Sequence, residues 1–135
     1  MQVSVHLTFN GQCEAAFRFY AQCLGGTIVT MLTYGDSPMA EQAPLEWRGK
    51  IVHATLTIGE NVLAGADLLP GDYQPPRGFF VLIEIDEPLG AERIFLELSE
   101  NGSVRMPLRE TFWARRFGVV TDRFGTPWEI SCGRS

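Results

Sequence analysis

The sequence predicts an α+β protein built from a duplicated βαβββ unit. Both halves of the 135 residues show the same order of elements: strand, helix, glycine stop, strand, loop, strand, turn and strand. Sliding the chain along itself by 76 positions, the separation of Ala15 and Ala91, also aligns Phe19 with Phe95 and Gly26 with Gly102. Self-similarity at a fixed spacing is typical of a repeated structural unit. Since one unit cannot bury its sheet face alone, we expect the two units to pack together or to swap between chains.

The first half contains four expected strands and one expected helix. Residues 3–9 alternate apolar and polar side chains with a period of two, which predicts a strand. After the turn signal Asn10-Gly11, apolar residues recur at helical spacing up to Leu24, and Gly25-Gly26 ends that helix. Further strands are expected at residues 27–32, 51–58 and 62–66, of which the last two form a hairpin; residues 35–48 are expected to form a loop with one short helix near residues 40–46.

The second half restarts the same order after a linker rich in proline and glycine. We expect a strand at residues 79–85, a helix at 89–98 that stops at Asn101-Gly102, and strands at 103–106, 113–120 and 127–132. The sequence therefore predicts one domain over residues 1–135, with a first module of about residues 1–67, a linker at 68–78 and a second module of about residues 79–135.

Composition excludes several classes of function. The net charge of −5 argues against a general nucleic-acid binder, because such proteins need a basic face. No run approaches the ~18 apolar residues of a membrane-spanning helix. The three cysteines form no C-x-x-C pair, and no signal peptide is visible, so we expect a cytoplasmic protein. No glycine-rich loop joins a strand to a helix, so no nucleotide cofactor is expected.

Four segments carry a resemblance to a known family: LTFNGQCEAAFRFY from Leu7, YGDSPMAEQ from Tyr34, HATLTIG from His53 and ETFWARRFGVVTDRFGTPWEI from Glu110. The chain resembles the PhnB-like branch of the glyoxalase/bleomycin-resistance/dioxygenase superfamily, also called the vicinal oxygen chelate superfamily. This resemblance implies that the modules bend into a half-open, cup-like mixed sheet with helices on the outer face. It also implies a homodimer and a small-molecule ligand.

The resemblance further implies one divalent metal ion, such as Zn, Ni, Mn or Fe, held by four inward strand positions. The final-strand position falls on Glu129, and its counterpart in the first module falls on Leu63 or Ala64. The first-strand position falls on Val5, with His6 one residue away, and the fifth-strand position falls around Phe80 or Val81. The usual set of four metal ligands is therefore incomplete in this chain, and we do not infer the glyoxalase activity of the superfamily for it.

His6, His53 and Glu129 form the candidate metal-binding trio, with Glu110 as a fourth candidate, because imidazole and carboxylate suit these metals. His53 and Glu129 are also the candidate catalytic residues. His53 alternates with threonines, so it faces either a polar cup, as a ligand or proton acceptor, or simply solvent. Glu129 lies between Trp128 and Ile130, which we expect to face the core. Its carboxylate then needs a cation, supplied by a metal or ligand or by an arginine such as Arg115 or Arg116.

Four residues near the start of the last segment are candidate ligand-binding residues: Glu110, Phe112, Trp113 and Arg115. Aromatic rings can stack on a ligand, and guanidinium groups can bind an anion through two hydrogen bonds. The alternative is that the aromatic residues pack into the core and the arginines pair with surface acids. The loop at residues 34–42 is long enough to act as a lid or as a dimer contact.

Three functions fit these observations. The first is a metal-assisted or metal-independent enzyme acting on a small oxygen-bearing substrate. The second is a non-catalytic protein that binds and sequesters a small molecule, in the manner of the bleomycin-resistance proteins. The third is a plain dimeric scaffold.

Overall fold

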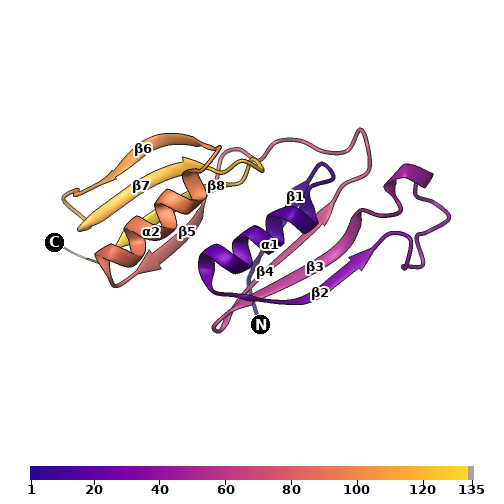
Figure 1. Cartoon of the computed structure of the whole chain (residues 1–135), viewed down its shortest axis with the longest axis horizontal. Coiled ribbons are helices and arrows are strands. Elements are labelled where there is room, and N and C mark those ends of the chain that lie inside the picture. The colour runs from indigo at the N-terminus through magenta and orange to yellow at the C-terminus, as the bar shows by residue number, and fades with distance from the viewer. Residues whose placement is uncertain (134–135) are drawn as a thin grey trace. The chain divides into compact units, whose positions relative to one another are not determined.

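A computed structural model describes residues 1–133, and the chain divides into two compact units (Figure 1). Unit 1 spans Met1–Gln74 and unit 2 begins at Pro75. Each described unit has the element order βαβββ, which confirms the predicted fold class.

Unit 1 contains α1 (Cys13–Leu24) and a short 3-10 turn, η1 (Leu45–Trp47); its strands are β1 (Val5–Phe9), β2 (Thr27–Thr33), β3 (Ile51–Ile58) and β4 (Asn61–Asp67). Unit 2 contains α2 (Pro88–Ser99); its strands are β5 (Val81–Ile85), β6 (Ser103–Arg109), β7 (Arg116–Thr121) and β8 (Pro127–Cys132).

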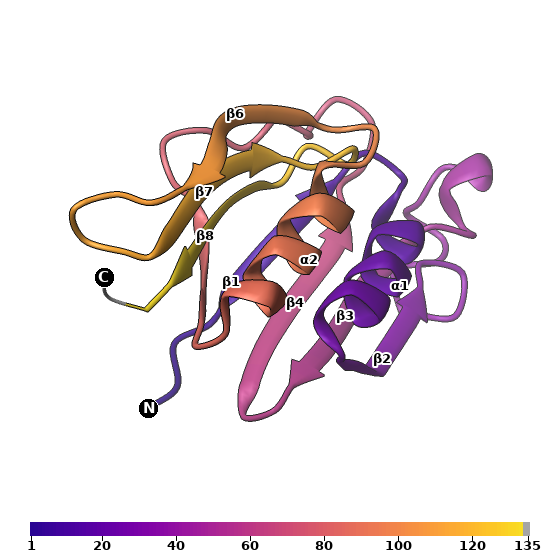
Figure 2. The same cartoon turned by 60° about the vertical axis from the view of Figure 1, so that its left-hand side comes forward.

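The two sheets have the same topology. Their strand orders are β1-β4-β3-β2 and β5-β8-β7-β6, so the first strand of each unit pairs in parallel with the last strand. The remaining pairs in both sheets are antiparallel. Helix α1 runs along one side of the first sheet and α2 runs along one side of the second, as the two views in Figures 1 and 2 show.

Some element boundaries differ from the sequence prediction for local reasons. Strand β7 begins at Arg116 rather than at residue 113, because Thr111 and Ala114 close a turn: the Thr111 N–H donates to the Ala114 carbonyl, and the Ala114 N–H donates to the Thr111 hydroxyl. The short helix expected near residues 40–46 lies further along the chain: it is the 3-10 helix η1, which starts after Pro44, and its Trp47 N–H donates to the Pro44 carbonyl.

A buried aspartate ties the parts of unit 1 together. Asp67, at the end of β4, is 1% exposed, and its carboxylate accepts hydrogen bonds from the N–H groups of Gly11, Cys13 and Ile51, each at 2.9 Å. Gln12, the N-cap residue of α1, makes no side-chain capping bond, so Asp67 satisfies the helix N-terminus in its place.

Asp122 has a similar role in unit 2. Its carboxylate accepts hydrogen bonds from the N–H groups of Phe124 and Thr126 in the turn between β7 and β8, and from the indole N–H of Trp128 at 2.8 Å. Trp128 is completely buried, so this bond satisfies its one polar atom and fixes the first residues of β8.

Each helix lies close to its sheet at a glycine. A Cβ atom at Gly65 would lie 2.7 Å from ring atoms of Phe17 in α1, and one at Gly118 would lie 2.8 Å from Cε2 of Phe95 in α2. We call a line of directly paired residues across neighbouring strands a row. The two glycines lie in equivalent rows of their sheets, Leu7–Gly65–Ala54 in unit 1 and Ile83–Ile130–Gly118 in unit 2. This row therefore faces the helix in both units.

The core of each unit lies between its helix and this face of its sheet. The buried apolar residues include Leu7, Phe9, Phe17, Tyr20 and Leu56 in unit 1 and Phe95, Leu98, Val120, Trp128 and Ile130 in unit 2. Over residues 1–133, no helix is both long enough and apolar enough to cross a membrane.

Gly65→Ala tests the close approach of α1. The added methyl group meets the Phe17 ring below van der Waals distance, so we expect a loss of about 1–3 kcal/mol in the free energy of unfolding, measured with urea. Gly49→Ala is the matched control, because a Cβ there has no heavy atom within 4 Å. Equal stability of the two variants would contradict the packing of α1 on this row.

Candidate functional site

The helix covers one face of each sheet, and we call the opposite face the helix-free face. Side chains alternate across a strand, and cross-strand partners share a face, so the glycine rows determine which residues lie on it. In unit 1 the helix-free face contains His6, Thr8, His53, Thr55, Ala64 and Ala66. In unit 2 it contains Leu82, Glu84, Phe117, Val119, Glu129 and Ser131.

The register in unit 1 shows which of the expected positions lie on the helix-free face. Val5 pairs with Leu63 two positions away from the Leu7–Gly65 pair, so both residues lie on the helix side of the sheet. His6 and Ala64 pair on the helix-free face instead. On the helix-free face the residue of β1 is therefore His6 rather than the expected Val5, and of the two alternatives Leu63 and Ala64 it is Ala64 that lies on this face.

Unit 2 repeats this arrangement. Val81 pairs with the buried Trp128 on the helix side, whereas Leu82 pairs with Glu129 on the helix-free face. Leu82 is thus the residue of β5 that pairs with Glu129 on this face, one position after the expected Val81. Trp128 and Ile130 are both fully buried, which confirms that they face the core and that Glu129 points the other way.

These rows allow a test of whether the chain fits a metal ion. Of the four equivalent positions, only His6 and Glu129 carry a metal-ligating group, because Ala64 and Leu82 are apolar. In residues 1–133, no group of three or more His, Cys, Asp or Glu side chains is arranged to hold a metal. The residues present therefore do not fit the metal site that the resemblance implies.

The predicted aromatic residues do gather, together with one that sequence reasoning missed. The rings of Phe112 and Trp113 lie 4.7 Å apart, and those of Trp113 and Phe117 lie 5.2 Å apart, both edge to face. Phe112 is 94% exposed and Trp113 is 45% exposed, so the alternative that these two residues pack into the core is wrong. We call Phe112, Trp113 and Phe117 the aromatic cluster. Phe117 places one end of it on the helix-free face.

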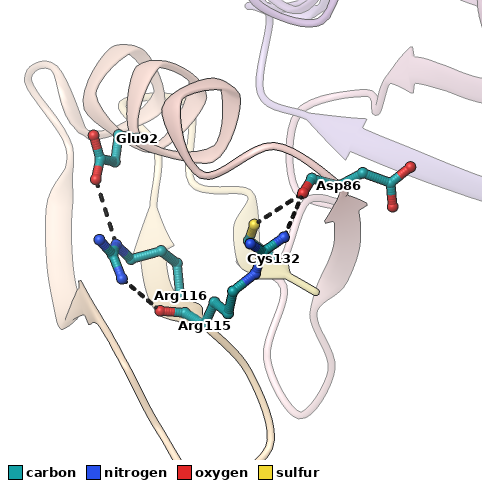
Figure 3. A network of polar contacts seen from close by, with 5 residues as sticks. All are labelled: Asp86, Glu92, Arg115, Arg116 and Cys132. Carbon is teal, nitrogen blue, oxygen red and sulfur yellow. Dashed lines mark hydrogen bonds and ion pairs between the residues drawn. The ribbon is translucent and has the colours of Figure 1, made fainter. Parts of the chain in front are cut away.

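The two predicted arginines are engaged elsewhere, as Figure 3 shows. The guanidinium of Arg115 donates to the Asp86 backbone carbonyl at 3.0 Å, and the same carbonyl accepts a longer contact from the Cys132 thiol. Arg116 pairs with Glu92 on α2, at 3.4 Å, and donates to the Arg115 carbonyl. Arg116 thus forms an ion pair with a surface acid, as one of the two alternatives predicted.

Glu129 consequently lacks the arginine partner that the sequence suggested. Within residues 1–133, its carboxylate makes no hydrogen bond or ion pair, although it is half-buried between Leu82 and Val119. Glu84 lies on the same face, on the adjacent strand β5. Its cross-strand partner is Ser131, and the same row continues to Phe117 and then to Arg109. Glu110 is exposed at the start of the loop that carries the aromatic cluster.

The cysteines are buried, and the loop after β2 is held at its start. All three cysteines are buried and free, and burial, followed by the charges of Asp67 and Glu14, raises the pKa of the Cys13 thiol, so this thiol stays protonated near neutral pH. The loop that follows β2 is anchored at Tyr34, whose hydroxyl donates to the Asp67 carbonyl at 2.6 Å. Burial and the nearby Asp67 and Asp72 carboxylates raise the pKa of Tyr34.

Sequence comparison identifies the class of protein that has this fold. A family model described as "Glyoxalase/Bleomycin resistance protein/Dioxygenase superfamily" matches residues 4–130, so the chain belongs to that superfamily. Protein YjdN of Escherichia coli K12 is 32% identical over 139 aligned residues, which cover 97% of this chain and 95% of that protein.

Solved structures share the fold over almost the whole chain. Protein PA1353 from Pseudomonas aeruginosa is 43% identical with a TM-score of 0.92, covering 100% of this chain and 99% of that one. A PhnB protein from Bacillus cereus is 20% identical with a TM-score of 0.84, covering 98% and 100%. A mutant of the fosfomycin resistance protein FosX from Listeria monocytogenes, solved with Mn(II), is 14% identical with a TM-score of 0.63, covering 98% and 92%; at this identity the likeness concerns the fold alone.

The incomplete set of metal ligands makes a prediction about metal content. Protein purified without chelator should contain no stoichiometric Zn, Ni, Mn or Fe by elemental analysis. Adding these metals should change the melting temperature of the wild type no more than that of the His6→Ala/Glu129→Ala double variant, since two donors at four positions do not complete a site. A stoichiometric metal that the double variant loses would contradict this reading.

Proposed function

We propose that this chain is a small-molecule-binding and sequestering member of its superfamily, and that its ligand lies on the helix-free face of unit 2. The observation that carries the proposal is the aromatic cluster, which extends from the exposed Phe112 to Phe117 on that face. Exposed aromatic surface of this kind is costly in water and is typical of binding sites.

The surroundings of the cluster support the same proposal. Leu82 is 51% exposed on the same face, and Glu84, Glu129 and Ser131 add polar groups between the apolar side chains. A mainly apolar surface with a few polar groups is the usual composition of a small-molecule site, in which apolar contacts supply affinity and polar contacts fix orientation.

A metal-assisted reaction is not part of this proposal. The divalent ion expected from the resemblance would need donors where this chain has Ala64 and Leu82. We therefore prefer binding without chemistry over the catalytic role considered for His53 and Glu129. The homodimer and the cytoplasmic location stay predictions from the sequence.

A thermal-shift screen of metabolites and glycopeptide-like compounds tests the proposed function. Compounds that raise the melting temperature of the wild type should lose most of that effect with Trp113→Ala and with Phe117→Leu, because each change removes aromatic contact area. Leu96→Ala is the control, since this residue is 72% exposed on α2, on the other side of the sheet.

The proposed function fails if no compound stabilises the wild type, or if every stabilising compound acts equally on Trp113→Ala, Phe117→Leu and Leu96→Ala.

A further inference from the structure

We infer that the ligand of the helix-free face of unit 2 is an organic cation, that is, a protonated or quaternary amine attached to an aromatic or apolar body. This inference rests on the proposed function and specifies the chemical class of its ligand. It follows from where the charges of unit 2 lie relative to this face.

Glu129 carries the central carboxylate of this face. Glu129 lies in the row Leu82–Glu129–Val119, so apolar side chains flank it on both neighbouring strands. A partly desolvated carboxylate is unfavourable unless a cation or hydrogen-bond donors compensate it, and within residues 1–133 no side chain does so. An external cation would supply the missing partner.

The arginines of unit 2 that could have paired with Glu129 are engaged elsewhere or lie apart from it. Arg115 is held by the Asp86 carbonyl and Arg116 by Glu92 beside α2, while the guanidinium of Arg105 lies 5.9 Å from the centre of the Phe80 ring. Arg109 is the cross-strand partner of Phe117, but it lies on β6. Strand β6 is two strands from β8, so the backbone of Arg109 is roughly 10 Å across the sheet from that of Glu129. Arg109 therefore borders the site, and the position next to Glu129 is left for a ligand.

The groups around Glu129 suit an organic cation rather than a metal ion. Glu129 is diagonal to Phe117 on the adjacent strand, a spacing of roughly 7–8 Å that one small organic molecule can bridge. Aromatic ring faces attract ammonium groups, and they stack on planar ligand bodies. They offer nothing to a divalent ion, which needs several oxygen or nitrogen donors. Glu84, on the next strand, adds a second negative charge on the same face.

Binding of three simple probes tests the inference on the full chain. Benzyltrimethylammonium, benzamide and benzoate share a single benzene ring and differ in the charge of the attached group. Each is titrated separately while the backbone amide signals are followed by NMR. We expect the cation to bind most tightly and to shift the amide signals of β7 and β8, and we expect benzoate to bind most weakly.

Charge-neutralising variants give the matched comparison. Glu129→Gln should weaken benzyltrimethylammonium binding by about tenfold and leave benzamide binding unchanged, because only the charge–charge contribution is lost. Glu87→Gln makes the same change of charge at an exposed residue that precedes α2, and it should weaken binding of the cation by less than about twofold.

The outcomes separate this inference from the proposed function. If benzamide or benzoate binds the β7–β8 region at least as tightly as the cation, or if Glu129→Gln and Glu87→Gln act equally, the charge of the ligand is assigned wrongly while the binding face stands. If none of the probes shifts signals of β7 or β8, the inference is overturned, and the thermal-shift screen decides the proposed function separately.

Discussion

In both units the helix rests on the same row of the sheet, and one residue of that row is a glycine. Gly65 leaves room for Phe17, and Gly118 leaves room for Phe95. Since side chains alternate across a regular strand, this contact decides the direction of the other side chains in the strands whose pairing is regular, namely β1, β3 and β4 in unit 1 and β5, β7 and β8 in unit 2. It directs Trp128 and Ile130 into the core and Glu129 away from it. The candidate site therefore depends on a packing constraint located on the opposite side of the sheet.

Two buried aspartates hold the ends of the elements that this packing brings together. Asp67 joins the N-terminus of α1 to the start of β3, and Asp122 joins the turn between β7 and β8 to the indole of Trp128. Both carboxylates accept several hydrogen bonds inside their own unit, so the internal donors compensate their charge. Glu129 differs from them, because no donor within residues 1–133 compensates its half-buried carboxylate. This contrast separates a structural acid from one available to a ligand.

Much of the fold follows from local sequence patterns. The alternation in residues 51–58 and 127–132 predicted β3 and β8 with the observed bounds, and the glycine stop after Leu24 is Gly25 in the left-handed conformation. The register could not be predicted to one residue, which is why Val5 was expected on the ligand-bearing face and the choice between Leu63 and Ala64 stayed open. Choosing between Val5 and His6 requires knowing that the helix covers the row of Gly65, and this is a tertiary contact. Phe117 was missed because its ring contacts Trp113 across a loop. The partners of Arg115 and Arg116 could not be predicted, because they are a carbonyl and a carboxylate distant in sequence.

The central claim is that the helix-free face of unit 2 is the ligand-binding surface of this superfamily member. Nuclear Overhauser contacts between the methyl groups of bound benzyltrimethylammonium and the side chains of the protein test it most directly. The account predicts contacts to the Phe117 ring and the Leu82 methyl groups, which flank Glu129 on the two adjacent strands. Contacts confined to α2, or to residues of unit 1 alone, would contradict it.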